Sequence, residues 1–225
     1  MKIARRVAAA LAAALVVALL AGTTSTPAGA GPNDRLLVIG DSTSSWYNEE
    51  PGSPSEAWWA IVARQLGADV TLSAEHGSGM WARGNKCQGT KFGDRLGEVS
   101  RIRPSLIIVA GGFNDTHGCD ASNKKVPIYE SSSKRAVDIY LTALADRVDS
   151  IGLDRSKVYV TTPWGSSKMD AHYWMWREQK AVAERLGFTY VTMRFNDSAQ
   201  TVDTVHQNRQ GNLNMAARFL AGMPS

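Results

Sequence analysis

Short apolar runs separated by longer amphipathic segments are the feature that most limits how this chain can fold. Several runs are apolar at every position, which is typical of strands in a parallel sheet covered on both faces. We expect five strands, over residues 36–39, 70–72, 106–110, 158–161 and 189–192. We expect helices between and after them, over residues 55–66, 92–101, 132–151, 171–186 and 210–223.

The alternation of strand and helix predicts an α/β fold: a three-layer α/β/α sandwich around a five-stranded parallel sheet. Gly67, Gly152 and Gly187 stand where three of the predicted helices should end, and Ser55 is a candidate N-cap for the first. Residues 116–133 are polar and lack periodicity. We expect them to form a long loop that shapes a binding site.

Residues 1–30 have the composition of a secretory signal peptide. Lys2, Arg5 and Arg6 precede an apolar stretch over 8–22, and Ala28-Gly29-Ala30 offers a cleavage site. An uncleaved membrane anchor is the alternative, but the apolar stretch is shorter than the roughly 20 residues that span a bilayer. We therefore expect a secreted, extracellular protein with one domain over 31–225 and no stable membrane insertion.

The positive charge of the chain belongs largely to this leader. The leader holds three of the 25 basic residues and none of the 21 acidic ones, which leaves 22 against 21 in residues 31–225. A nearly neutral domain without a basic stripe argues against nucleic acid as a partner. We expect a monomer.

Cys87 and Cys119 are the two cysteines of the chain. Export to an oxidising compartment favours a disulfide between them, and a pair of free buried thiols is the alternative. Two cysteines are too few for a structural zinc site.

Polar motifs follow four of the five predicted strands directly or within a short distance. Gly40-Asp41-Ser42 follows the first, His76-Gly-Ser-Gly79 the second and Gly111-Gly-Phe-Asn114 the third, whereas Asp203 and His206 follow the fifth. Ligands bind beyond the carboxyl ends of the strands in open parallel sheets. All four motifs should therefore meet at one edge.

These residue types fit nucleophilic catalysis by a serine. Ser42 would attack, His206 would remove its proton, and Asp203, three residues earlier, would orient the imidazole. The backbone amides of Ser42 and Gly79 and the side chain of Asn114 could form an oxyanion hole. Each motif alone also fits an ordinary turn, a helix cap or a surface histidine.

Taken together, the motifs resemble the four blocks of the SGNH, or GDSL-type, hydrolase family. Gly40-Asp41-Ser42, Gly79, Gly112-Phe-Asn-Asp115 and Asp203-Thr-Val-His206 carry the resemblance, which spans about residues 36–220. It implies a flavodoxin-like sheet, the Ser42–His206–Asp203 triad, and an oxyanion hole of Ser42, Gly79 and Asn114. Thr43 and Gln207 depart from the residues usual there, and Gly77 remains an alternative to Gly79.

We expect hydrolysis of carboxylic esters through an acyl-enzyme, with a small acyl ester or an acetylated carbohydrate as substrate and no cofactor. Trp46, Trp81 and Trp164 are candidates for stacking on sugar rings, whereas Trp58 and Trp59 fit the core. His76, His117, His172 and Asp120 match no recognised metal-ligand spacing, so we expect no metal. A lipid esterase or acyltransferase of the same fold, and a non-catalytic carbohydrate-binding module, are the alternatives.

Overall fold

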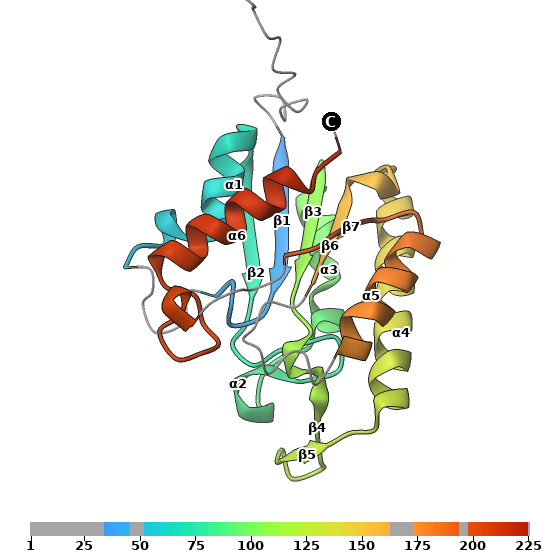
Figure 1. Cartoon of the computed structure of the whole chain (residues 1–225). Coiled ribbons are helices and arrows are strands. Elements are labelled where there is room, and N and C mark those ends of the chain that lie inside the picture. The colour runs from blue at the N-terminus through green and yellow to red at the C-terminus, as the bar shows by residue number, and fades with distance from the viewer. Residues whose placement is uncertain (1–33, 46–51, 163–172, 194–197, 225) are drawn as a thin grey trace, which may run out of the picture.

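The computed structural model describes residues 34–45, 52–162, 173–193 and 198–224. Five parallel strands form the central sheet in the order β2-β1-β3-β6-β7 (Figure 1). The strands are β1 (Arg35–Gly40), β2 (Asp69–Ala74), β3 (Leu106–Ala110), β6 (Val158–Thr161) and β7 (Thr189–Val191). The prediction of a five-stranded parallel sheet is confirmed.

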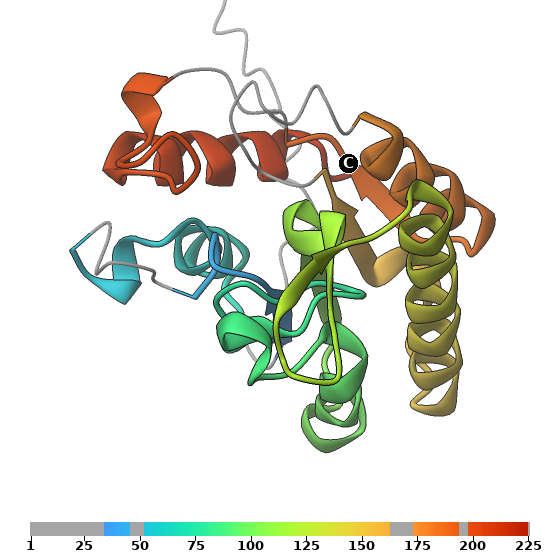
Figure 2. The same cartoon turned by 90° about the horizontal axis from the view of Figure 1, so that it is seen from below.

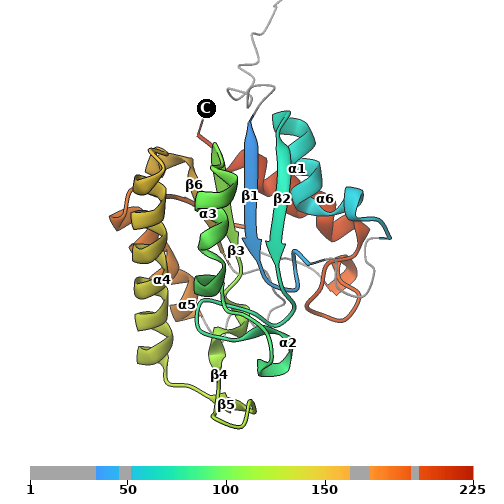
Figure 3. The same ribbon diagram turned by 180° about the vertical axis from the view of Figure 1, so that it is seen from behind.

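Helices cover both faces of this sheet. On one face lie α1 (Trp58–Leu66) and α6 (Arg209–Ala221), and on the other lie α3 (Gly97–Ile102), α4 (Glu130–Ser150) and α5 (Tyr173–Arg185) (Figures 1 and 3). The described ranges also contain short helices of three or four residues: η2 (Pro54–Glu56), α2 (Gly84–Cys87), η3 (Phe92–Arg95), η4 (Phe113–Thr116), η5 (Arg155–Lys157) and η7 (Ser198–Gln200). Among the helices of the described ranges, none has both the length and the apolar character needed to cross a membrane.

The core consists of one apolar cluster on each face of the sheet. Successive residues of β1 alternate between them: Leu36 and Val38 face α1 and α6, whereas Leu37 and Ile39 face α3 and α4. All four are fully buried. This double burial explains why the strands are apolar at every position.

The strand order places β1 between β2 and β3, with Gly40 paired to Ala74 on one side and Ala110 on the other. The loops that leave these three strands therefore start at the same level of the sheet. The order of strands also reverses here, because β2 lies to one side of β1, whereas β3, β6 and β7 lie to the other. Such a reversal is where ligands bind in doubly wound sheets.

Three local predictions were wrong. Residues 116–133 include an antiparallel hairpin of β4 (His117–Cys119) and β5 (Lys125–Pro127), whose strands are too short to show alternation in the sequence. The first helix begins at Trp58, and Ser53, not Ser55, caps the turn before it. The segment predicted as one helix over 92–101 is divided at Leu96 into η3 and α3.

Candidate active site

A tight turn at the end of β1 carries Ser42, which is half-buried. The buried carboxylate of Asp41 accepts hydrogen bonds from the backbone N–H and the hydroxyl of Thr43, at 2.9 and 2.8 Å. A Cβ at Gly40 would lie 2.5 Å from Ser44 Oγ, so only glycine lets the chain turn this closely. Asp41 therefore has the structural role expected of a turn former.

Asp203 and His206 form a hydrogen-bonded pair after η7. Asp203 Oδ1 accepts from the backbone N–H groups of Val205 and His206, and Oδ2 lies 2.6 Å from His206 Nδ1. Although partial burial raises the pKa of Asp203, the hydrogen bonds from the backbone and ring of His206 hold it below its ordinary value. An ionised carboxylate only accepts, so Nδ1 carries the proton and Nε2 is the basic nitrogen of the ring.

The structure brings this pair to the turn that carries Ser42. Gln207, the residue after His206, donates from Nε2 to the carbonyl oxygen of Thr43, the residue after Ser42. The pKa of buried Asp41 is raised by desolvation, and the charge of His206 is near enough to oppose that shift. Ser42 and His206 thus belong to two loops that are joined side by side.

The loop after β2 is organised by Asp115. This fully buried carboxylate accepts from the backbone N–H groups of Met80, Trp81 and Ala82, at 2.7–2.9 Å. A Cβ at Gly79 would lie 2.3 Å from Asp115 Oδ1, so glycine is required there whatever its part in catalysis. The Gly79 amide itself donates to the carbonyl oxygen of Ala82 at 2.9 Å.

Asn114 lies in η4, after β3, and contacts the loop after β2. Its Nδ2 donates to the carbonyl oxygen of Ser78 at 2.9 Å, which uses one of its two hydrogens and fixes the orientation of the amide. The second hydrogen can serve another acceptor. This bond holds the Asn114 side chain against the loop over residues 75–83, so their N–H groups lie side by side.

Arg95 is a site residue that the sequence analysis missed. Its guanidinium donates to the carbonyl oxygens of Gly40 and Ser73 and to Ser78 Oγ, at 2.6–3.2 Å, and lies 5.0 Å from the centre of the Phe92 ring. It ties the end of β1 to the loop after β2. No local sequence pattern distinguishes this arginine from one on the surface, because its hydrogen-bond partners lie 17 to 55 residues earlier in the chain.

The remaining predicted residues have different outcomes. Trp81 is 41% exposed in the loop after β2, and Trp58 and Trp59 are buried as expected. The disulfide between Cys87 and Cys119 is present. Trp46, Trp164 and His172 lie outside the described residues. The described ranges contain no group of three or more His, Cys, Asp or Glu side chains that could hold a metal ion.

The model of the GDSL-like lipase/acylhydrolase family matches residues 38–213 of the chain. This match covers the Ser42 turn, the loops that carry Gly79 and Asn114, and the Asp203–His206 pair. A comparison with curated protein sequences gave no match.

Several solved structures share the fold. An acetylxylan esterase from Geobacillus stearothermophilus is 18% identical with a TM-score of 0.60, over 88% of this chain and 96% of that one. A family two carbohydrate esterase from Clostridium thermocellum, in complex with cellohexaose, is 16% identical with a TM-score of 0.63. The match covers 87% of this chain and 64% of that one. A lipase/acylhydrolase from Enterococcus faecalis is 15% identical with a TM-score of 0.58, over 84% and 94%. At these identities the likeness concerns the fold.

Proposed function

The chain belongs to the GDSL-like lipase/acylhydrolase family and is an ester hydrolase. We propose that it is a secreted serine esterase whose catalytic residues are Ser42, His206 and Asp203. The observation that carries the assignment of residues is the Asp203–His206 hydrogen bond of 2.6 Å on a loop joined to the Ser42 turn by Gln207. A serine nucleophile needs this base and this orienting carboxylate.

In the first half of the reaction, Ser42 Oγ forms a bond to the ester carbonyl carbon and its proton passes to His206 Nε2. The tetrahedral intermediate then collapses, the bond to the alcohol oxygen breaks, and His206 returns the proton to that oxygen. Water repeats these steps on the acyl-enzyme and releases the acid. Asp203 stays ionised and stabilises the imidazolium throughout.

The oxyanion of each intermediate would be held by the Ser42 amide and by the second Nδ2 hydrogen of Asn114. For Gly79 to be the third donor, its amide would have to share the hydrogen that now goes to the carbonyl oxygen of Ala82. Gly77, which has a left-handed φ of 75°, remains the alternative from the same loop.

We propose an acetylated carbohydrate as the substrate. Exposed Trp81 follows Gly79 and Met80, so a sugar ring stacked on it would sit next to the donor loop. Of the proteins that share the fold, one is described as a carbohydrate esterase and another as an acetylxylan esterase. The alternative, a lipid esterase, predicts a preference for long acyl chains, so a p-nitrophenyl ester series from acetate to palmitate separates the two.

Secretion is proposed from the leader and is compatible with the disulfide, since structural disulfides persist mainly in oxidising compartments. N-terminal sequencing of the protein recovered from culture medium tests this part. A mature N-terminus at residue 31 is expected, and retention of the leader in a membrane fraction would contradict it.

The catalytic assignment is tested with Ser42→Ala, Asp203→Asn and, as the matched control in the same turn, Ser45→Ala. We expect Ser42→Ala and Asp203→Asn to lower kcat for p-nitrophenyl acetate by about 10⁴-fold or more, with an unchanged circular dichroism spectrum. A fluorophosphonate probe should label the parent protein and Ser45→Ala but not Ser42→Ala. Parental turnover by Ser42→Ala would refute the assignment.

A further inference from the structure

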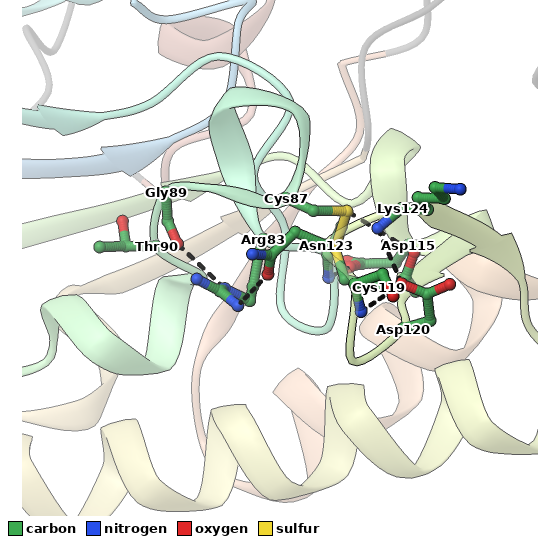
Figure 4. Close-up of a disulfide and its surroundings, with 12 residues drawn as sticks. Arg83, Cys87, Gly89, Thr90, Asp115, Cys119, Asp120, Asn123 and Lys124 are labelled. Atoms are coloured by element: carbon green, nitrogen blue, oxygen red, sulfur yellow. Dashed lines mark hydrogen bonds between the residues drawn. A yellow bond between two sulfur atoms is a disulfide. The ribbon is translucent and has the colours of Figure 1, made fainter.

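The disulfide joins two loops at the carboxyl edge into one unit, here called the bridged rim and defined as residues 81–88 and 117–125. Figure 2 shows the loop after β2 beside the β4–β5 hairpin. Cys87 comes from the loop after β2, and Cys119 ends strand β4 of the hairpin (Figure 4). Arg83 adds a second link between the loops, because its Nη1 donates to Asn123 Oδ1 at 3.1 Å. The bridged rim therefore has a defined shape.

Positive charge is concentrated on the bridged rim. Its four basic residues, all exposed, are Arg83, Lys86, Lys124 and Lys125. Its single acid, Asp120, accepts from the backbone N–H groups of Ser122 and Lys124 and so stabilises the hairpin turn. Because residues 31–225 hold 22 basic and 21 acidic residues in all, this excess is a local feature.

The backbone that presents Lys86 is strained. Asn85, Lys86 and Cys87 have φ values of 45°, 55° and 72°, three consecutive left-handed residues without a glycine. Each such residue costs roughly 1–2 kcal/mol. The conformation is enforced by the disulfide and by the Asn85 N–H, which donates to the carbonyl oxygen of His76 at 2.8 Å. Strained backbone conformations of this kind cluster at ligand-binding and catalytic segments.

Backbone hydrogen bonds tie the bridged rim to the turn that carries Ser42. The Asn85 N–H, next to Lys86, binds the carbonyl oxygen of His76, and the N–H of Glu75, the residue before His76, donates to the carbonyl oxygen of Gly40 at 3.2 Å. Burial, the charge of His206, and then the charges of Lys125 and Lys86 lower the pKa of His76 below its ordinary value, and the charge of Glu75 opposes this shift. His76 therefore lies within electrostatic reach of both the catalytic imidazole and these lysines. Lys125 is the cross-strand partner of Cys119, and Cys119 is bonded to Cys87, the residue after Lys86, so the two lysines flank the disulfide.

We propose that the bridged rim is a subsite for a carboxylate of the substrate, so that the natural ester belongs to a glycan that contains uronic acid. Lys86 and Lys125 attract the carboxylate, while Trp81, which is exposed on the same unit, offers a ring for stacking. This subsite rests on the proposed esterase function and adds a substrate class to it.

The test compares acetylated polygalacturonate, which is anionic, with acetylated xylan, which is neutral. We expect Lys86→Gln and Lys125→Gln each to lower kcat/KM for the anionic polymer by about fivefold at low salt, mainly through KM. The values for xylan and p-nitrophenyl acetate should stay within about twofold, and 0.5 M NaCl should abolish the difference. Lys157→Gln is the matched control, since it removes one exposed lysine at the opposite edge, just before β6.

Equal losses on both polymers, or no salt-sensitive preference in the parent protein, would overturn the subsite and leave the esterase function intact. Hydrolysis of no ester at all would instead overturn the esterase function. In that case, binding measured by calorimetry still tests the subsite. The Ser42→Ala protein should bind trigalacturonate more tightly than xylotriose, and adding both Lys86→Gln and Lys125→Gln should remove this difference. Lysine-dependent binding to phosphatidylglycerol vesicles without trigalacturonate binding would overturn the glycan assignment.

Discussion

Gln207 donates a hydrogen bond from its side-chain amide to the carbonyl oxygen of Thr43, across 164 residues of sequence. Trp58 Nε1 donates to the same oxygen at 3.1 Å, and Asn212 Oδ1 accepts from the Trp58 N–H at 2.9 Å and from Gln207 Nε2 at 3.4 Å. All four residues are buried. The loops of Ser42 and His206 are thus joined by a shared polar network.

We expect Gln207→Ala to lower kcat by about 10- to 100-fold with little change in KM, because displacement of a catalytic group by about 1 Å has an effect of this size. The free energy of unfolding should fall by about 1–3 kcal/mol from the lost buried hydrogen bond. Gln210→Ala is the control, since Gln210 is exposed in α6, just after Gln207, and donates to Asn214 within that helix. Unchanged kcat, together with the loss of stability, would show that Gln207 has no part in positioning.

Asn114→Ala should lower kcat by about 10²–10³-fold, the usual effect of removing one oxyanion donor. The variant also loses the bond to the Ser78 carbonyl oxygen, so a change in unfolding temperature is measured beside the kinetics. Asn214→Ala, which removes an amide from α6, is the control. A loss of stability without a loss of kcat would exclude Asn114 from the oxyanion hole.

Replacing both cysteines by serine should lower the free energy of unfolding by about 3.5 kcal/mol, given the sequence separation of 32 residues. Turnover of p-nitrophenyl acetate should fall as well, because the freed loop leads into the segment that carries Gly79. Reductant should reproduce both effects in the parent protein and change nothing in the variant. If neither property moved, the disulfide would have no role in stiffening the oxyanion side.

The pH dependence of stability should reveal Asp115. Burial raises its pKa to about 6, although three backbone N–H groups bind the carboxylate. With an unfolded value near 3.8, the carboxyl stabilises the fold fully below about pH 4, and this contribution of about 3 kcal/mol is lost as the pH rises through 6. The unfolding free energy of the parent minus that of Asp115→Asn should therefore decrease from pH 4 to 7. A constant difference would contradict the shift.

The sheet could be predicted because its strands are buried on both faces and therefore leave uninterrupted apolar runs in the sequence. The rule that parallel strands bring their carboxyl ends to one edge then placed the Ser42, Asn114 and His206 loops together. The hairpin of β4 and β5 could not be found in this way. Its strands have three residues each and are held by Cys119 and the Asp120 turn instead of by an apolar face.

The supporting residues of the site could not be predicted either. Arg95, Gln207 and Asn212 act through partners that are distant in sequence, and their own surroundings in the chain resemble ordinary helix or loop. In the sequence, Gln207 stands out only because another residue usually follows the histidine in the family that the motifs resemble. Its role follows from the bond to Thr43, which requires three-dimensional coordinates.

On the proposed catalytic assignment, the Thr43–Gln207 bond joins two parts of the site that are synthesised far apart in time. Ser42 leaves the ribosome early, whereas Asp203, His206 and the α6 residue Asn212 are made last. Until then, the nascent polypeptide carries a serine without its base and a first helix without its final hydrogen-bond acceptor. A translation product that stops before residue 200 would have the strands of the sheet, and on the same assignment we expect it not to cleave esters inside the cell that makes it.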